Sequence, residues 1–251
     1  MIDSHCHLDF EDFDADRQQV IERAQQAGIE KIIIAGISQT TWSHLRQVCE
    51  QYNNLYACYG LHPYFIEQHE IPHLDDLKNT LQQSKAVALG ECGLDFYLSD
   101  LDKDKQQFFF EAQLDIADEL NLPVVIHSRK ANQQILTALK KHPNLRGMVH
   151  SFSGSIEVAQ QFIKRDFYIS LGAVVTFERA TKIRKLAEQL PLDALLIESD
   201  APDQSGLKHN NQRNEPAYIV ETIAAIAELK KISLDEVAAA SYKNALELFS
   251  L

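Results

Sequence analysis

The sequence predicts an α/β protein with a single domain, a TIM (β/α)8 barrel that covers residues 1–251. Three observations lead to this prediction. Short apolar runs alternate with longer amphipathic segments, this alternation occurs eight times, and several of the runs are apolar at nearly every position. A mean spacing of about 30 residues between the runs is what eight strands with eight following helices require.

The expected strands follow from the apolar runs. Ile32-Ile33-Ile34 and Val124-Val125-Ile126 are clear examples, because no polar residue interrupts them. Runs of this kind are typical of parallel strands that are buried on both faces. The eight strands are expected at residues 1–7, 31–35, 55–59, 86–91, 123–127, 146–150, 167–171 and 194–200.

The expected helices lie between the strands and after the last one. The first helix ends before Gly28, a residue type that commonly terminates helices. The last helix begins after Ser233 and has Glu236 three residues later, as in a capping box. The helices are expected at residues 16–27, 40–52, 74–83, 104–120, 131–141, 155–164, 180–190, 216–229 and 234–248.

A doubly wound open sheet is the alternative fold with the same alternation of strands and helices. That fold usually carries a glycine-rich, phosphate-binding turn after its first strand. The corresponding residues here are His5-Cys6-His7-Leu8-Asp9, which favours the barrel. No proline- or serine-rich linker and no low-complexity tract interrupts the pattern, so we expect one domain.

Composition limits the classes of function. The chain has 24 basic and 36 acidic residues, and its net charge of −12 does not suit broad, counterion-releasing binding to nucleic acid. Contacts with a phosphate must therefore be local, through metal ions and a few basic side chains. The four cysteines lack Cys-x-x-Cys spacing, no stretch approaches 18 consecutive apolar residues, and the first residues do not resemble a signal peptide. We therefore expect a cytoplasmic protein without a membrane segment.

Polar residues at the strand ends indicate a metal site. The first two histidines are two residues apart, so on a strand their imidazoles point to the same face. Because the carboxyl ends of barrel strands meet on one face, side chains from different strands are expected to gather there. Burial of so many titratable groups without an ion would be costly. The predicted metal ligands are His5, His7, Glu91, His127, His150 and Asp200.

Six ligands are more than a single tetrahedral site requires. Two divalent ions a few ångströms apart would use all of them, with Glu91 of the fourth strand as the bridge. Mixed imidazole and carboxylate ligation suits Zn²⁺, Mn²⁺ or Mg²⁺, and ligand type alone does not choose among these ions.

Seven motifs occur in order along nearly the whole chain. They are Asp3-Ser4-His5-Cys6-His7-Leu8-Asp9, Gly60-Leu61-His62-Pro63, Gly90-Glu91-Cys92-Gly93-Leu94-Asp95, His127-Ser128-Arg129, His150-Ser151-Phe152-Ser153-Gly154, Glu198-Ser199-Asp200-Ala201-Pro202 and Arg213-Asn214-Glu215-Pro216. Together they resemble the TatD family of metal-dependent deoxyribonucleases, which are amidohydrolase-like barrels. The resemblance implies a TIM barrel, a divalent-metal centre and hydrolysis of phosphodiester bonds, typically of DNA from a 3′ end. Asp203 stands where many members carry an aromatic residue, so the chain looks more like the subgroup described only as uncharacterised hydrolases.

The predicted reaction is metal-assisted hydrolysis, in which the ions lower the pKa of a bound water and polarise a phosphoryl oxygen. Asp200 and Glu91 are the predicted catalytic residues. Asp200 would ligate one ion and accept the proton of the attacking water as general base. Glu91 would join the ion held by the histidines of the first strand to the ion held by those of the fifth and sixth. Arg129 and His62 are the predicted substrate-binding residues, because a guanidinium can bind phosphate through two parallel hydrogen bonds and because the resemblance to the family motif Gly60-Leu61-His62-Pro63 implies that His62 lies at the cleft.

Several other polar residues have simpler interpretations. Asn214 is expected to cap a helix. Glu198 shares strand parity with Asp200, so it either supports a metal ligand or belongs to a buried network. Asp95 either organises its loop or touches substrate. Four further histidines are expected in loops or at helix ends, exposed to solvent: His69, His73, His142 and His209.

Two other functions remain open. A similar barrel could hydrolyse a cyclic amide, a lactone or a carboxylic ester. Phosphotriesterase-like relatives usually supply a modified lysine from the fourth strand, which here ends in Glu91, and this weighs against them. A metal-stabilised scaffold without activity would leave Arg129 unexplained. The expected substrate is therefore DNA or another phosphodiester, and neither membrane contact nor an obligate protein partner is expected.

Overall fold

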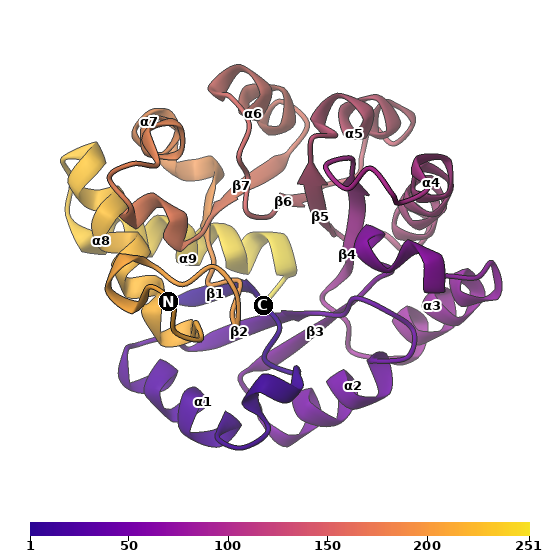
Figure 1. Ribbon diagram of the computed structural model, residues 1–251, viewed down its shortest axis with the longest axis horizontal. Coiled ribbons are helices and arrows are strands. Elements are labelled where there is room, and N and C mark those ends of the chain that lie inside the picture. The colour runs from indigo at the N-terminus through magenta and orange to yellow at the C-terminus, as the bar shows by residue number, and fades with distance from the viewer.

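The strands form a single sheet. The computed structural model describes residues 1–251, and its eight parallel strands are hydrogen-bonded to one another in the order β1 to β8. They are β1 (Ile2–Cys6), β2 (Lys31–Ala35), β3 (Leu55–Tyr59), β4 (Ala88–Asp95), β5 (Val124–Arg129), β6 (Gly147–Val149), β7 (Phe167–Leu171) and β8 (Leu195–Ile197). Figure 1 shows the helices arranged around these strands. The expected TIM barrel is confirmed.

Nine α-helices accompany the strands. They are α1 (Arg17–Gln26), α2 (Trp42–Gln51), α3 (Pro72–Gln83), α4 (Lys103–Leu120), α5 (Asn132–Ala138), α6 (Ile156–Ile163), α7 (Thr181–Gln189), α8 (Ile219–Lys230) and α9 (Leu234–Phe249). The capping box expected before α9 is present, with Ser233 and Glu236 bonded reciprocally. The helix expected from residue 216 instead begins with a separate 3-10 turn, Pro216–Tyr218. None of the helices combines the length and the apolar composition that a membrane crossing requires.

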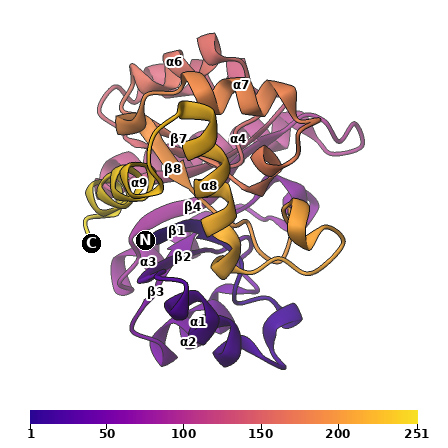
Figure 2. The same ribbon diagram turned by 90° about the vertical axis from the view of Figure 1, so that its left-hand side faces the viewer.

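The last helix fills one end of the barrel. Buried side chains near the starts of several strands, such as Ile2, Ile33 and Val125, form one apolar cluster with Leu248 and Phe249 of α9. Figure 2 shows α9 at one side of the molecule, next to the strands. Because α9 covers the end where the strands begin, the end where they finish is left for the polar side chains.

The barrel closes where the first strand meets the segment after the last one. The backbone N–H of Asp200 donates to the carbonyl oxygen of His5 at 3.0 Å, and the N–H of His7 donates to the carbonyl oxygen of Ala201 at 2.8 Å. The eighth strand was expected to reach residue 200, but β8 ends at Ile197. The chain after Ile197 bonds to β1 instead of continuing a regular ladder.

A buried carboxylate strengthens this seam. Asp3 has no solvent exposure, and its two oxygens accept hydrogen bonds from the backbone N–H of Ser199 at 2.9 Å and from the Ser199 hydroxyl at 2.6 Å. The Asp3 side chain therefore supplies acceptors that a neighbouring backbone would supply in a regular sheet.

Glycine at position 93 allows β4 and β5 to approach closely near the metal ligands. Gly93 has a φ of 144°, which residues with a side chain rarely adopt, and a Cβ atom there would overlap the carbonyl oxygen of His127. Gly93 is paired with His127 in the sheet. This contact brings the end of β4, with Glu91, against the end of β5.

We expect Asp3→Ala to lower the free energy of unfolding by about 2–4 kcal/mol, because two buried donors of Ser199 would lose their acceptor. Urea denaturation followed by circular dichroism measures the change. Asp75→Ala, at an exposed position of α3, is the matched control and should change stability by less than about 0.5 kcal/mol. Equal effects of the two substitutions would contradict the role of Asp3 in the seam.

Candidate metal centre

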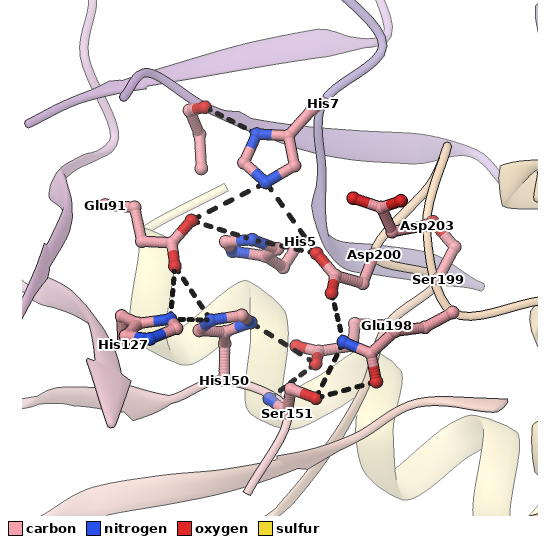
Figure 3. Close-up of polar contacts among 12 residues, drawn as sticks. His5, His7, Glu91, His127, His150, Ser151, Glu198, Ser199, Asp200 and Asp203 are labelled. Carbon is pink, nitrogen blue, oxygen red and sulfur yellow. Dashed lines mark hydrogen bonds and ion pairs between the residues drawn. The ribbon is translucent and has the colours of Figure 1, made fainter. Parts of the chain in front are cut away.

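The carboxyl ends of the strands surround a cavity of about 660 Å³. The six side chains that were predicted as metal ligands lie together there (Figure 3). His5 lies on β1, with His7 just beyond it, Glu91 on β4 and His127 on β5, while His150 and Asp200 follow the ends of β6 and β8. The structure adds His62, which follows β3 and also lines the cavity.

A first group of ligand atoms surrounds one oxygen of Glu91. The Nε2 atom of His5 lies 3.3 Å from Glu91 Oε2 and 3.5 Å from Asp200 Oδ1. The Nε2 atom of His7 lies 3.5 Å and 3.7 Å from the same two oxygens. Two imidazole nitrogens and two carboxylate oxygens thus converge on one point, which is a ligand set that divalent transition metals accept.

A second group surrounds the other oxygen of Glu91. Glu91 Oε1 lies 2.8 Å from His150 Nε2, 3.0 Å from His62 Nε2 and 3.2 Å from His127 Nδ1. Figure 3 shows Glu91 between His7 on one side and the pair His127 and His150 on the other. Glu91 therefore occupies the position that a bridging carboxylate needs.

His62 lies deeper than a contact at the edge of the cleft would require. Its exposed fraction is 9%, and its Nε2 atom lies 3.0 Å from Glu91 Oε1, slightly closer than His127 Nδ1 at 3.2 Å. Burial lowers the pKa of His62 to about 4, so its ring is neutral at physiological pH and keeps a lone pair for a ligand. His62 lies beyond the end of β3, and this position in the sequence indicated a contact at the cleft but not a place so close to Glu91.

Neighbouring groups fix the orientation of two imidazoles. His7 Nδ1 lies 3.0 Å from the carbonyl oxygen of Ala35, which can only accept a hydrogen bond, so Nδ1 carries the proton and Nε2 presents its lone pair. His127 Nε2 lies 3.2 Å from Asp95 Oδ2, which directs Nδ1 toward Glu91. Asp95, the last residue of β4, thus orients the imidazole of a candidate metal ligand.

Glu198 holds the third imidazole from behind. Its Oε1 atom lies 3.6 Å from His150 Nδ1 and accepts a hydrogen bond from the backbone N–H of Ser151 at 2.6 Å. Burial by itself would lower the pKa of His150, but the carboxylates of Glu91 and Glu198 outweigh it and raise this pKa well above its usual range. Glu198 therefore belongs to the polar network that supports the centre.

The chain alone leaves polar atoms of the centre unsatisfied. His5 has no solvent exposure, and neither of its ring nitrogens makes a hydrogen bond. A buried polar group without a partner costs about 1–3 kcal/mol. A divalent cation between His5, Glu91 and Asp200 would accept the Nε2 lone pair and offset the two carboxylates, so the residues present fit a metal.

The charge on Glu91 is stabilised by its neighbours. Burial by itself would raise the pKa of Glu91, but the surrounding imidazoles, above all the charge of His150, outweigh burial and hold the pKa well below its usual range. Glu91 is therefore ionised, as a metal ligand must be.

Asp200 has the opposite tendency. Burial raises its pKa to about 6, although the charges of His150 and His7 act against this rise. A carboxylate with a pKa near neutrality accepts a proton more readily than an ordinary aspartate. Asp200 is the group of the centre whose environment best suits a general base.

A buried amide fixes the turn that carries Asp200. The φ of Asp200 is 57°, in the left-handed region that only a few per cent of residues other than glycine adopt. The Nδ2 atom of Asn214 donates to the carbonyl oxygen of Ser199 at 2.6 Å and to that of Asp203 at 2.8 Å, so it bonds to both sides of the turn. The expectation that Asn214 caps a helix is wrong, because Glu215 is the capping residue and Asn214 faces back toward β8.

Two histidines that were expected to be exposed to solvent are buried. His69 has an exposed fraction of 2%, and its Nε2 atom lies 2.9 Å from the carbonyl oxygen of His62. His142 has an exposed fraction of 7% and lies between Asp115 and Asp118. The expectation failed because loops and helix ends here pack on neighbouring elements.

One arginine stands at the wall of the cavity. Arg129 is the only lysine or arginine that lines it, and its side chain makes no hydrogen bond and no ion pair. The guanidinium carbon lies 3.8 Å from the centre of the Tyr97 ring, so the planar group is supported from one side. Its donors remain available to a ligand.

Comparisons with known proteins agree with this centre. The family model described as "TatD related DNase" matches residues 2–250. The chain belongs to the TatD family.

Relatives in that family cover the whole chain. The "Uncharacterized metal-dependent hydrolase YjjV" of Escherichia coli (strain K12) is 37% identical, over 100% of this chain and 98% of the relative. The "Uncharacterized metal-dependent hydrolase YabD" of Bacillus subtilis (strain 168) is 36% identical, over 100% of this chain and 99% of the relative. The crystal structure of the Escherichia coli YjjV protein matches with a TM-score of 0.95 and covers 100% of this chain and 98% of that one. The chain is accordingly a metal-dependent hydrolase of the TatD family.

We expect divalent metal to raise the melting temperature of this TatD-family protein by about 5–10 °C after chelator treatment, at concentrations near 100 times the dissociation constant. Differential scanning fluorimetry with Mg²⁺, Mn²⁺ and Zn²⁺ in turn measures the shift. Glu91→Gln should lose most of the response, whereas Glu228→Gln, on the exposed side of α8, should keep it. A melting temperature that none of the three ions changes would contradict the metal centre.

We expect Asn214→Asp to lower the free energy of unfolding by about 2–4 kcal/mol, because a carboxylate would face two carbonyl oxygens in a buried position. Metal binding, measured by isothermal titration calorimetry, should weaken at the same time, since the turn with Asp200 loses its support. Asn210→Asp adds the same charge at an exposed position of the same loop and is the control. If the two variants behaved alike, Asn214 would have no special role in this turn.

Proposed function

We propose that the protein is a divalent-metal-dependent phosphodiesterase that hydrolyses DNA, with the character of a 3′-to-5′ exonuclease. The observation that carries this proposal is the position of Glu91, whose two oxygens face two separate groups of imidazoles. Centres with two ions and a bridging carboxylate are common among enzymes that hydrolyse phosphate esters. The description of the family as TatD related DNase supports the same substrate.

The centre would hold two ions. His5, His7 and Asp200 would bind the first, His127 and His150 the second, and Glu91 both. Zn²⁺, Mn²⁺ and Mg²⁺ are the candidates. When bound, the ions lower the pKa of a ligated water molecule and polarise the phosphoryl group.

Asp200 would move the proton. Its carboxylate accepts a proton from the attacking water while the water oxygen forms a bond to phosphorus. The bond from phosphorus to the oxygen of the neighbouring nucleotide breaks, and this oxygen leaves as a hydroxyl group after it takes a proton from solvent. Gln204 donates a hydrogen bond to Asp200 Oδ2, which keeps the carboxylate turned toward the ligands.

Arg129 and His62 would bind the substrate. The guanidinium of Arg129 has five N–H donors and no hydrogen-bond partner in the protein. It can therefore bind the phosphate oxygens of a DNA strand as it would bind a carboxylate in an ion pair. His62 lines the same cavity with a neutral ring beside Glu91. Because Arg129 is the only lysine or arginine that lines the cavity and the net charge is −12, contact with DNA would be short and local.

The proposal is tested with 5′-labelled single- and double-stranded DNA, in the presence of Mg²⁺, Mn²⁺, Zn²⁺ or a chelator. We expect shortening from the 3′ end that stops when the chelator is added. Asp200→Asn should lower kcat by about 10²- to 10⁴-fold, because the variant lacks the proton acceptor.

Glu228→Gln is the control for that experiment and should keep the wild-type rate. Absence of DNA cleavage with every metal, together with turnover of lactone or ester substrates, would overturn the proposal in favour of a small-molecule hydrolase. Normal turnover by Asp200→Asn would remove Asp200 from the mechanism.

A further inference from the structure

Charge is distributed unevenly around the cavity. Apart from histidines, four charged side chains line it: Glu91, Arg129, Asp200 and Asp203. Glu91 and Asp200 face the imidazoles and would be neutralised by the metal ions. Arg129 is the last residue of β5, whereas Asp203 follows β8, three strands further in the sheet order. The cavity thus has a cationic side and an anionic side.

The carboxyl group of Asp203 has no partner in the protein. Its side chain is exposed in the cavity and makes no hydrogen bond and no ion pair. Figure 3 shows Asp203 on the side of His7 and Asp200, away from His127 and His150. A ligand that reaches this side of the centre meets a free carboxylate.

The backbone of Asp203 is held in place. Its N–H donates to the carbonyl oxygen of Asp200 at 2.9 Å, and its own carbonyl oxygen accepts the bond from Asn214 Nδ2 at 2.8 Å. Asn214 is fully buried. The carboxylate can change its rotamer, but the turn cannot carry it away from the cavity.

The cationic side suits the continuing strand. Tyr64 and Tyr97, from the loops after β3 and β4, have exposed fractions of 56% and 57%, and Arg129 lies on the Tyr97 ring. The exposed Tyr97 ring under Arg129 offers a stacking surface for a base beside a donor for a phosphate, and Tyr64 lines the same cavity as Arg129. The opposite side, with Asp203, offers an acceptor and no cation.

We propose that Asp203 restricts cleavage to strand ends that carry a free hydroxyl group. This inference rests on the proposed function. With the scissile phosphate at the centre and the strand on the Arg129 side, the terminal nucleoside lies on the Asp203 side. A terminal hydroxyl can donate a hydrogen bond to the carboxylate. A terminal phosphate, with a charge of about −1.5 to −2 at neutral pH, is repelled by it.

The same repulsion excludes internal bonds. A strand that continued past the centre would place its next phosphate on the side of Asp203, where no lysine or arginine lines the cavity. Two like charges a few ångströms apart near a protein surface repel strongly enough to change a rate about tenfold or more. One unpaired carboxylate would therefore make the enzyme act on ends.

The test compares two 5′-labelled single strands of identical sequence, one ending in a 3′-hydroxyl and the other in a 3′-phosphate. Both are incubated with the activating metal and the full-length protein. We expect the wild type to cleave the hydroxyl end at least about tenfold faster. In Asp203→Asn this ratio should fall to about threefold or less, because the variant keeps the shape of the side chain but lacks its charge. Glu228→Gln, which removes one negative charge outside the cavity, should keep the wild-type ratio.

The salt dependence of the rates provides an independent measurement. As ionic strength rises, screening should lower the ratio of the rate on the 3′-hydroxyl strand to the rate on the 3′-phosphate strand for the wild type, and leave this ratio almost unchanged for Asp203→Asn. Asp203→Ser serves as a second variant, and circular dichroism shows whether each variant is folded. Equal rates of the wild type on both ends would overturn the inference while the proposed function stands. An unchanged ratio in both folded variants would overturn it as well, because another group would then make the selection. If neither strand is cleaved with any metal, the proposed function itself fails and the inference with it.

Discussion

Closure of the barrel between its first and last strands is the constraint on which the centre depends. His5 and His7 come from the first residues of the chain, whereas Asp200 comes from its last quarter. The backbone bonds between these two segments place Asp200 Oδ1 within 3.5 to 3.7 Å of both imidazoles. The buried Asp3 carboxylate secures that junction from inside the barrel. A seam that opened by a few ångströms would separate the ligands of one ion while the remaining strands stayed paired.

Glu91 determines how the rest of the centre is charged. Because both of its oxygens face imidazoles, the carboxylate stays ionised despite its burial. The imidazoles around it stabilise its negative charge. Asp200 lacks such close support, so burial raises its pKa. The two buried carboxylates therefore differ in what they can do: Glu91 is suited to bind cations, and Asp200 can also take up a proton. This division follows from the number of imidazoles around each.

The sequence is most informative where a local pattern reports a backbone conformation. The bounds of β2, β3 and β7 agree with the apolar runs, and the residues that end the strands identify the histidines and carboxylates that meet in the cavity. Contacts between distant segments leave no such pattern. Asn214 bonds to carbonyl groups on either side of Asp200, and only the folded turn brings them within reach. His62 is a different case, because the sequence indicated its position after the third strand but not how deeply its side chain is buried.

The packing of α9 determines how substrate enters the barrel and how product leaves it. Apolar side chains of α9 and of the strand starts fill the end of the barrel opposite the cavity. The cavity is therefore open only at the carboxyl ends of the strands. A molecule that enters at the mouth must leave by the same route. In each turnover the product must therefore dissociate before the next substrate can reach the metal centre. Product release and substrate binding use the same opening of the cavity.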